Sequence, residues 1–450
     1  MSQRSNFSSK IGFVLAAAGS AVGLGNLWRF PYLAAKYGGG TFLLVYLILA
    51  VTFGFSLMIA EIAIGRKTGL SAIGAFKKLD KRFGFLGVLA AIIPIIIFPY
   101  YSVIGGWVIK YFVTFVTGNV QAAADDAYFN NFIGTTGEPI GWFCLFIAFT
   151  SIIVLLGVEK GIETVSKFMM PVLVVLTVII AGYGLTVDGA IDGLIYYVKP
   201  SMENFSGMTV IAAMGQLFYS MSLAMGIMIT YGSYMKKDNM ESSVRQIEVF
   251  DTGIAFMAGL MIIPAVFAFS GGTAEQLGQG PGLMFVMLPK VFNSMPMGGA
   301  IGTLFFILVF FAALTSSISL METIVSILRD KFHWSRKFTC IIVTVIALIM
   351  GIPSSLGFGI WSDITFLNLS ILDAFDFLSN SILMPILAFF TCIFVGFVIK
   401  PKVVIDEVKS SDGTFKGEKL FVVMIKWIAP ICLIAILVSS VGNAMGWWTI

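Results

Sequence analysis

The chain has 450 residues, of which 58% are hydrophobic and only 12% are charged, and its mean hydropathy is +0.96. Soluble globular domains contain about 45–50% apolar and about 25% charged residues, so this composition excludes that class and predicts a polytopic membrane protein. The formal net charge of +4 is small for the length, and the basic residues lie in short connecting segments, so we expect no nucleic-acid partner.

Few side chains are suited to enzyme chemistry. The single histidine, His333, lies in a charged connecting segment, and the spans predicted below contain no Ser/Lys pair that would supply a nucleophile with its base. The four cysteines lie inside apolar runs without paired spacing, which favours buried structural residues over a metal or disulfide site. We therefore expect that the protein is not an enzyme.

Apolar runs of about 20 residues, the length that crosses about 30 Å of hydrocarbon, mark the membrane spans. The sequence contains eleven such runs. In chain order they cover residues 11–35, 41–64, 85–116, 140–156, 162–185, 208–234, 249–270, 298–328, 338–352, 372–399 and 420–441. The first run is longer than the apolar part of a signal peptide and lacks a small-residue cleavage site, so we expect it to remain as span 1.

Loop charges predict the orientation. The segment after span 2 carries six basic residues, whereas the segment after span 3 carries acidic residues and no basic one. By the positive-inside rule the former is cytoplasmic. Alternation along the eleven spans then places every later basic cluster on that side. This pattern predicts a cytoplasmic N-terminus and an external C-terminus.

Span 1 contains the stretch AAAGSAVGLGNLWRFPYLAAKYGGG, which is unlike an uninterrupted helix. Gly19 and Gly23 alone would also suit close packing of another helix. Gly23 and Gly25, however, are two residues apart and precede Asn26, and two glycines within one turn weaken a helix. They free backbone polar groups that hydrocarbon cannot satisfy, so we predict a break in span 1 around a polar cavity.

Span 6 shows a second interruption, GQLFYSMSLAMGIMITYGSY, in which Gln216, Ser220, Ser222 and Gly226 interrupt an apolar run. Spans 1 and 6 occupy corresponding positions if spans 1–5 and 6–10 are two structural repeats. Matched breaks in two halves are the sequence pattern of a secondary transporter with its site near the midplane.

The chemistry of such breaks suits a zwitterion and a hard cation. Half-helix N-termini offer N–H groups to an anion, and half-helix C-termini offer carbonyls to a cation such as Na⁺. Asn26, Ser220 and the hydroxyls of AALTSSIS in span 8 are further candidate ligands. Those span 8 hydroxyls equally suit bonds back to their own helix. Intramembrane polar residues converge on one level of spans 1, 6, 7 and 8, which favours a transporter over a channel.

Four motifs carry a family resemblance. They are AGSAVGLGNLWRFPYLAAKYGGG in span 1, PYYSVIGGW in span 3, GQLFYSMSLAMG in span 6 and FAALTSSIS in span 8. Together they resemble the neurotransmitter:sodium symporter family, specifically its bacterial sodium-dependent amino-acid transporters, over nearly the whole chain. The resemblance implies an all-α integral membrane protein of the bacterial inner (plasma) membrane. The implied fold is the leucine-transporter-type 5+5 inverted repeat with eleven transmembrane helices and unwound spans 1 and 6.

The implied organisation has five parts. They are a cytoplasmic N-terminal segment (1–10), the first five-helix repeat (11–185), the second, inverted repeat (206–399), a cytoplasmic linker (400–419), and the eleventh span with the outer C-terminus (420–450).

The resemblance also implies two sodium ions. The first is held by the Ala21 carbonyl, the Asn26 side chain, the Ser220 carbonyl and hydroxyl, the Asp251 carboxylate and the substrate's own carboxylate. The second is held by the carbonyls of Gly19, Val22 and Ala312 and the hydroxyls of Thr315 and Ser316. Animal relatives typically have asparagine and a nearby chloride where this chain has Asp251, so we expect chloride-independent transport. An ordinary charge near a cytoplasmic helix end is the alternative interpretation of Asp251.

The implied substrate site uses residues of spans 1, 3, 6 and 8. The carboxylate meets the amides of Leu24 and Gly25 and the Tyr101 hydroxyl, and the ammonium meets the carbonyls of Ala21, Tyr219 and Ser220 and the Ser222 hydroxyl. The side-chain pocket is lined by Ile97, Tyr101, Tyr219, Met225, Ser316 and Leu320. Met225 stands where relatives selective for small aliphatics have phenylalanine, and an unbranched thioether repacks around larger groups. We therefore expect a hydrophobic or aromatic amino acid.

Gates are implied at both mouths of the site. Arg29 and Asp376 resemble the outer pair, and Arg4 and Asp330 resemble the inner pair, with Phe7 as an aromatic plug. A capping or packing role is the alternative for Asp376. In span 5, Gly161 is followed after nine residues by Pro171, which resembles a bacterial motif that unwinds to hydrate the second sodium site, or else marks a packing kink.

The predicted function is Na⁺-coupled uptake of a hydrophobic or aromatic amino acid by alternating access. The partners are the amino acid, sodium ions and the lipid bilayer. Two alternatives stay open: a proton-driven amino-acid permease of the same architecture, and a non-transporting amino-acid sensor.

Overall fold

The computed structural model describes residues 6–236, 238–270, 280–411 and 413–447. Within these ranges the regular structure is helical, and the β structure is limited to one isolated bridge between Phe366 and Leu369. The all-α prediction is therefore confirmed for the described residues.

Nine described helices are long and apolar enough to cross a membrane. They cover Gly40–Thr68 (α3, η2 and α4), Lys81–Val116 (η3 and α6), Gly137–Leu155 (α9), Val158–Gly184 (η4 and α10), Met240–Ser270 (α14), Gly298–Phe332 (α16), Arg336–Leu356 (α17), Ile371–Val398 (α18, η8, α19 and η9) and Glu418–Ala444 (α21, η10 and α22). A bent pair counts as a tenth span, formed by α1 (Lys10–Ala21) and the helix Gly25–Lys36, which joins η1 to α2.

The predicted sixth span is not one long helix. It consists of α12 (Gly207–Ser220) and α13 (Ile227–Gly232), which are too short to count separately as spans. The prediction of eleven spans thus requires that α12 and α13 cross the membrane together. Span 7 also differs from the prediction of 249–270, because the helix begins at Met240 and its first turns carry Glu241 and Arg245.

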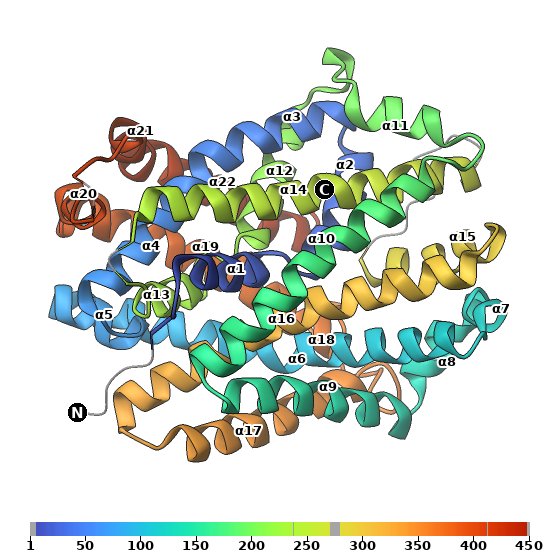
Figure 1. Ribbon diagram of the computed structural model, residues 1–450, viewed down its shortest axis with the longest axis horizontal. Helices are drawn as coiled ribbons and strands as arrows, with labels where there is room; N and C mark the ends of the chain where they lie inside the picture. The colour runs from blue at the N-terminus through green and yellow to red at the C-terminus, as the bar shows by residue number, and fades with distance from the viewer. Residues whose placement is uncertain (1–5, 237, 271–279, 412, 448–450) are drawn as a thin grey trace.

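Short helices lie between the spans. They are α5 (Ala72–Leu79), α7 (Val120–Ala123), α8 (Asp126–Gly134), α11 (Ala190–Val198), η5 (Met202–Asn204), η7 (Leu283–Met287), α15 (Leu288–Ser294) and α20 (Pro401–Lys409). Figure 1 shows α5, α13 and α20 at one end of the long helices and α7, α8 and α15 at the other.

The long helices differ in burial. In the most apolar window of α16, 78% of the residues are buried, whereas the corresponding value for α9 is 33%. α6 packs directly against both α16 and α9. α16 therefore forms part of the centre of the bundle, and α9 lies at its periphery.

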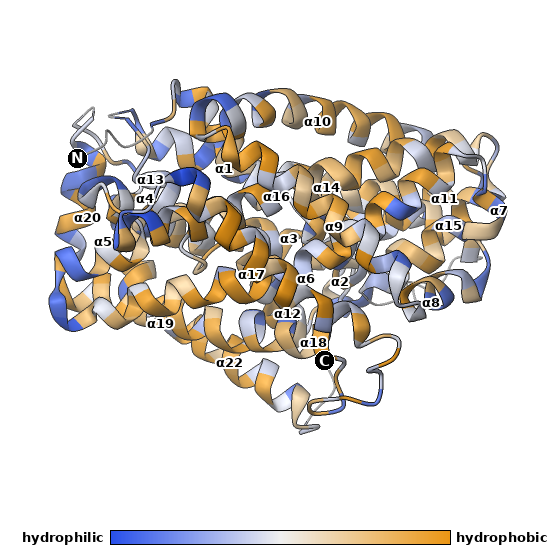
Figure 2. Ribbon diagram, turned by 90° about the horizontal axis from the view of Figure 1, so that it is seen from below, coloured by the Kyte–Doolittle hydropathy of each residue, from blue (hydrophilic) through white to orange (hydrophobic). Residues whose placement is uncertain are grey.

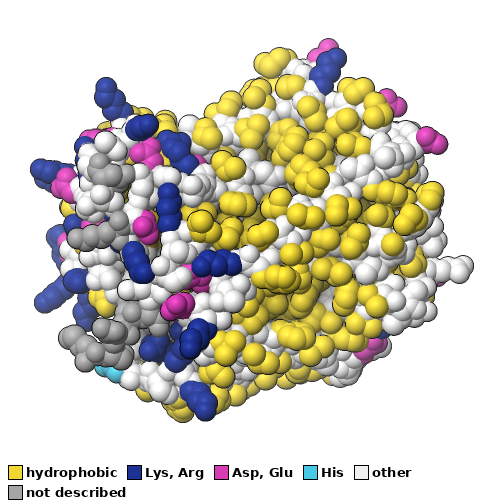
Figure 3. Space-filling view, viewed as in Figure 1, with side chains coloured by type: hydrophobic (Ala, Val, Ile, Leu, Met, Phe, Trp, Pro, Cys, Tyr) yellow, Lys and Arg dark blue, Asp and Glu magenta, His cyan; other side chains and the backbone are white. Residues whose placement is uncertain are grey.

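The outer surface matches a protein surrounded by lipid. Large apolar side chains are exposed on peripheral helices, for example Ile152 on α9 (57%), Val175 on α10 (56%) and Ile431 on α22 (68%). Lysines and arginines gather at the end that carries α5, α13 and α20, beside a broad apolar face (Figure 3). Figure 2 shows the hydrophobic parts of the long helices between hydrophilic segments at their two ends. A surface with this much exposed apolar area is expected where the surrounding solvent is hydrocarbon.

Candidate functional site

The first helix break lies between α1 and η1. α1 ends at Ala21, the helix resumes at Gly25, and the two segments meet at an angle of 55°. Gly23 is needed here because a Cβ would lie 2.8 Å from the Ser316 hydroxyl and 3.2 Å from the Tyr101 hydroxyl. The break exposes carbonyls at the end of α1 and amides at the start of η1, which gives it one cation-binding and one anion-binding side.

The second break lies between α12 and α13. Ser222, Ala224 and Gly226 have positive φ values of 53°, 55° and 71°. Ala224 is a strained choice, because a non-glycine residue in the left-handed region costs about 1–3 kcal/mol. Its amide donates to Glu61 Oε1 at 2.7 Å, and Glu61 is only 3% exposed. A buried side chain of α4 therefore satisfies a backbone amide of this non-helical turn.

The two breaks contact each other directly. The Ser222 hydroxyl donates to the Ser20 carbonyl at 2.8 Å, and the Ser20 hydroxyl donates to the Ser222 hydroxyl at 3.2 Å. Gln216 Nε2 donates to the Gly25 carbonyl at 3.0 Å. The Ser222 side chain thus satisfies a carbonyl freed at the end of α1, as is required where water is excluded. The Gln216 bond is a second one for the Gly25 carbonyl, which also accepts from the Phe30 amide.

A cavity lies between the breaks, with a volume of about 40 Å³ that the centres of water molecules can occupy. Its lining includes all eleven residues that the sequence assigned to the substrate site: Ala21, Leu24, Gly25, Ile97, Tyr101, Tyr219, Ser220, Ser222, Met225, Ser316 and Leu320. Asn26, which the sequence assigned to a sodium ion, also lines it. Sequence reasoning missed Ser20, Gly23, Ile227 and Asn380 as lining residues.

The cavity has a polar and an apolar part. The Leu24 amide points to the Tyr101 hydroxyl at a distance of 3.5 Å, which is a long and weak hydrogen bond. Ile97, Met225 and Leu320 supply apolar wall. A ligand with charged groups at one end and an apolar side chain at the other suits this division.

Asp251 lies beside the cavity and is fully buried. Its Oδ1 accepts hydrogen bonds from Asn26 Nδ2 and from the Ser220 hydroxyl, both at 2.8 Å. Its Oδ2 has no hydrogen-bond partner among the described residues, and the Tyr46 side chain lies beside the carboxyl group. Because a buried carboxylate without compensation is costly, this oxygen is suited to a cation.

A second group of oxygen atoms converges on Ser316. Its hydroxyl lies 3.4 Å from the Gly19 carbonyl oxygen, 3.1 Å from that of Ser20 and 3.3 Å from that of Val22. One hydroxyl has a single proton to share among these three acceptors.

Thr315, the preceding residue, donates its hydroxyl to the Phe311 carbonyl at 2.9 Å and the Ala312 carbonyl at 3.1 Å, within its own helix. The five residues assigned to the second sodium therefore lie on α1, α16 and the break after α1. The surplus of acceptors around Ser316 matches a hard cation, which prefers oxygen ligands.

The described residues contain no group of three or more His, Cys, Asp and Glu side chains placed to hold a metal ion. Such groups are typical of transition metals, whereas carbonyls and hydroxyls are the oxygens that surround Ser316.

The outer gate residues do not form the direct pair that the sequence suggested. Among the described ion pairs closer than 4.0 Å, none joins Arg29 to Asp376. Arg29 instead lies over the ring of Tyr219, with its guanidinium carbon 5.0 Å from the ring centroid. Asp376 Oδ1 accepts hydrogen bonds from Tyr100 at 3.1 Å and from Asn380 at 2.6 Å.

On the opposite side of the site, Arg4 lies outside the described residues, so its predicted pairing with Asp330 stays a prediction. Asp330 Oδ2 accepts hydrogen bonds from the Ser71 amide at 2.8 Å and the Ser71 hydroxyl at 2.6 Å. Phe7 is 1% exposed and packs edge-on against Tyr231 of α13, 5.5 Å between ring centroids. Phe7 therefore packs against the helix that follows the second break.

Comparison with known proteins decides the family. The sequence model of the sodium:neurotransmitter symporter family matches residues 4–135 and 129–446. The chain belongs to this family. An uncharacterized sodium-dependent transporter of Bacillus subtilis is 33% identical over 448 residues, which cover 97% of each chain.

More distant and structural relatives agree. A sodium- and chloride-dependent GABA transporter of Drosophila melanogaster is 28% identical over 418 residues, 80% of this chain and 44% of that protein. The crystal structure of MhsT in complex with L-phenylalanine superposes with a TM-score of 0.87 at 38% identity, covering 97% of this chain and 100% of MhsT. These matches confirm the predicted family and fold class. The protein is a sodium-dependent secondary transporter and not an enzyme.

Proposed function

We propose that this symporter couples inward movement of two Na⁺ ions to uptake of a hydrophobic or aromatic L-amino acid, by alternating access and without chloride. The observation that carries the proposal is the pair of helix breaks around one cavity. They offer amides on one side, and carbonyls with the unpartnered Asp251 Oδ2 on the other. A zwitterion and a cation satisfy both sets of groups together.

The apolar wall supports a hydrophobic substrate. A volume of about 40 Å³ corresponds to a few water molecules, so an aromatic side chain requires the wall to move. Met225 has three rotatable bonds and repacks at low cost. Tyr219 contacts Arg29 with one face of its ring. It is the second side chain of the wall that we expect to move. The complex of MhsT with L-phenylalanine supports the same substrate class.

Chloride independence rests on Asp251. Its carboxylate accepts hydrogen bonds from Asn26 and Ser220, which favour the charged form, so it is placed to supply a negative charge next to the cavity. A transporter with a neutral residue at this position needs a mobile anion to balance the same cation. The carboxylate makes that anion unnecessary.

Alternating access needs a cover on each side of the site. We assign Tyr219 with Arg29 to the outer cover and Phe7 with Tyr231 to the inner one. We also propose that the end rich in lysine and arginine faces the cytoplasm of a bacterial cell, which leaves the N-terminus inside and the C-terminus outside.

Ligand binding to purified protein tests the proposal. Binding of labelled L-phenylalanine, L-tryptophan, L-leucine and glycine is measured in Na⁺ and in K⁺ at equal ionic strength. We expect saturable binding of the three apolar amino acids only in Na⁺, weak binding of glycine, and no change when gluconate replaces chloride.

Equal binding in K⁺ that varies with pH contradicts sodium coupling and favours the proton-driven permease. Sodium-dependent binding without transport in vesicles favours the sensor. Preferential binding of glycine refutes the substrate class but leaves sodium coupling intact.

A further inference from the structure

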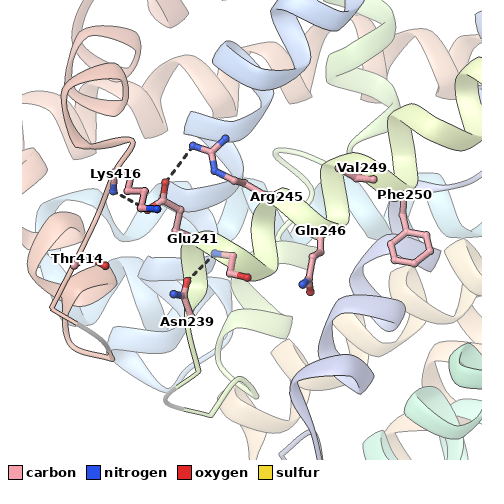
Figure 4. Close-up of a pocket in the computed structure, with 9 residues that line it drawn as sticks. Asn239, Glu241, Arg245, Gln246, Val249, Phe250, Thr414 and Lys416 are labelled. Atoms are coloured by element: carbon pink, nitrogen blue, oxygen red, sulfur yellow. Dashed lines mark hydrogen bonds and ion pairs between the residues drawn. The ribbon is translucent and has the colours of Figure 1, made fainter.

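A second concave site lies at the basic end of the molecule, away from the substrate cavity. Its volume is about 420 Å³, and it lies between the first turns of α14 and the segment that precedes α21. In Figure 4, Arg245, Gln246, Val249 and Phe250 project from successive turns of α14, and Thr414 and Lys416 lie on the other chain segment. We call this site the interfacial groove. Its volume falls in the range of small-ligand sites, about 300–1,000 Å³.

The groove has a surplus of hydrogen-bond donors. Glu241 contributes the carboxylate among its lining residues, and both oxygens of that carboxylate are already used. Oε1 accepts from Arg245 and from the Gly417 amide, both at 3.1 Å, and Oε2 accepts from the Lys416 amide at 2.8 Å.

Arg245 donates one of its five N–H groups to Glu241, and its side chain remains 46% exposed. The Lys416 ammonium and the Gln246 amide have no hydrogen-bond partner in the described part of the chain, and both residues are exposed. A third cation, Lys10, reaches the edge of the groove, where its ammonium donates to the Ser242 hydroxyl at 2.9 Å. The groove is therefore complementary to an anion.

The other end of the groove is apolar and faces the bilayer. Val249, one turn beyond Arg245, is 72% exposed and is followed by the half-buried Phe250. The long apolar part of α14 continues from here. Figure 3 shows basic side chains along the border of the apolar face. A ligand of this groove must join an anionic group to an apolar body at the membrane surface.

We propose that the interfacial groove binds the head group of an anionic phospholipid, with its phosphate at Arg245 and Lys416 and its acyl chains along Val249 and Phe250. Basic pockets between transmembrane helices at a membrane surface bind such head groups. The bound lipid bridges α14, which carries Asp251, to the segment before α21. It thereby joins the span next to the substrate cavity to the last span of the described chain.

Native mass spectrometry of detergent-solubilised protein tests this site directly. The protein is titrated with phosphatidylglycerol, which is anionic, with phosphatidylcholine, which is zwitterionic, and with inorganic phosphate. The test variant is Arg245→Gln with Lys416→Gln. The matched control is Lys77→Gln with Lys81→Gln, which removes the same charge from exposed residues at the same end of the molecule.

We expect the wild type to retain phosphatidylglycerol in preference to phosphatidylcholine. The test variant should bind phosphatidylglycerol at least tenfold more weakly, since each basic residue at a membrane surface contributes about 1 kcal/mol, and the control should stay within twofold. A second variant, Val249→Glu, places a negative charge at the apolar end, leaves both cations in place, and should give the same loss.

Three results would overturn the proposal. An equal loss in the control variant shows attraction to the basic end as a whole. Equal retention of the two lipids shows that charge is irrelevant. Competition by inorganic phosphate at the concentration of the lipid shows a free-phosphate site. None of these readouts depends on transport, so the proposed function stands or falls separately.

Discussion

Individual glycines and polar side chains create the site, and only some of them could be recognised from the sequence. The residues of the span 1 and span 6 motifs could be placed around one cavity because the motifs are continuous and specific. Asn380 and Ser20 were missed because a polar residue in an apolar run does not reveal which face of its helix it occupies. Glu61 was missed for a different reason. Its partner, the Ala224 amide, lies in the break between α12 and α13, far along the chain, and only the fold brings the two together.

At Gly25, a side chain of any size meets the cover of the cavity. A Cβ there would lie 2.5 Å from Cε1 of Tyr219. We expect Gly25→Ala to weaken amino-acid binding about tenfold or more, because overpacking costs about 1–3 kcal/mol. The matched control is Gly215→Ala in α12, where a Cβ meets nothing within 4 Å. Equal dissociation constants for the two variants would show that Tyr219 does not cover the bound ligand.

The prediction of chloride independence depends on the carboxylate of Asp251. In Asp251→Asn the fixed negative charge is lost, so we expect a lower affinity for Na⁺ and a new stimulation of binding by chloride. The measurement is the Na⁺ concentration for half-maximal binding, in chloride and in gluconate. Asp188→Asn, an exposed carboxylate between α10 and α11, serves as the control. An unchanged Na⁺ affinity in Asp251→Asn would remove Asp251 from the sodium site.

Broken and weakened helices are the elements that the sequence predicted best, and the structure adds the residues at which each break begins and ends. Two glycines in one turn indicated the break in span 1, and the structure places it between Ala21 and Gly25. The amphipathic helices α5 and α20 were not predicted, because runs of eight and nine residues give too little apolar length to count as spans. The π-helical stretches, such as η8 (Phe377–Leu383) beside Asp376, follow no residue pattern that was recognised.

Span 5 contains a weakened helical stretch, which predicts an effect on the rate of uptake. It begins with the π-helical η4 (Val158–Glu163) and contains Pro171 inside α10 (Thr164–Gly184). We propose that this stretch unwinds toward the cytoplasm during the cycle. Pro171→Ala restores a backbone donor and strengthens the helix, so we expect several-fold slower uptake with unchanged equilibrium binding. Pro353→Ala in α17 is the control, and equal slowing in both variants would argue against a special role of span 5.

Whole-molecule properties were the most predictable from composition and loop charge. Hydropathy alone indicated a polytopic membrane protein, and the apolar outer face of the bundle agrees (Figure 3). Energetics also operate at this scale. At about 100 mV each inward charge contributes about 2.3 kcal/mol, and a tenfold Na⁺ gradient adds about 1.4 kcal/mol. Two sodium ions would supply roughly 7 kcal/mol, enough for about 10⁵-fold accumulation of the substrate.

Orientation is the whole-molecule prediction that labelling tests. In a background without the four native cysteines, Asp188→Cys and Lys81→Cys place single thiols at opposite ends of the long helices. We expect a membrane-impermeant maleimide to label the first in intact cells and the second only after permeabilisation, because basic segments stay cytoplasmic. The reverse pattern would invert the topology.

Reconstituted vesicles allow sodium-driven uptake of the amino acid to be measured. Labelled L-phenylalanine and L-leucine are supplied outside proteoliposomes with an inward Na⁺ gradient, or with K⁺ or choline in its place. We expect accumulation above the external concentration only with the Na⁺ gradient, unaffected by chloride removal and abolished in Asp251→Ala. Uptake that persists in K⁺ and collapses with a proton ionophore would contradict it.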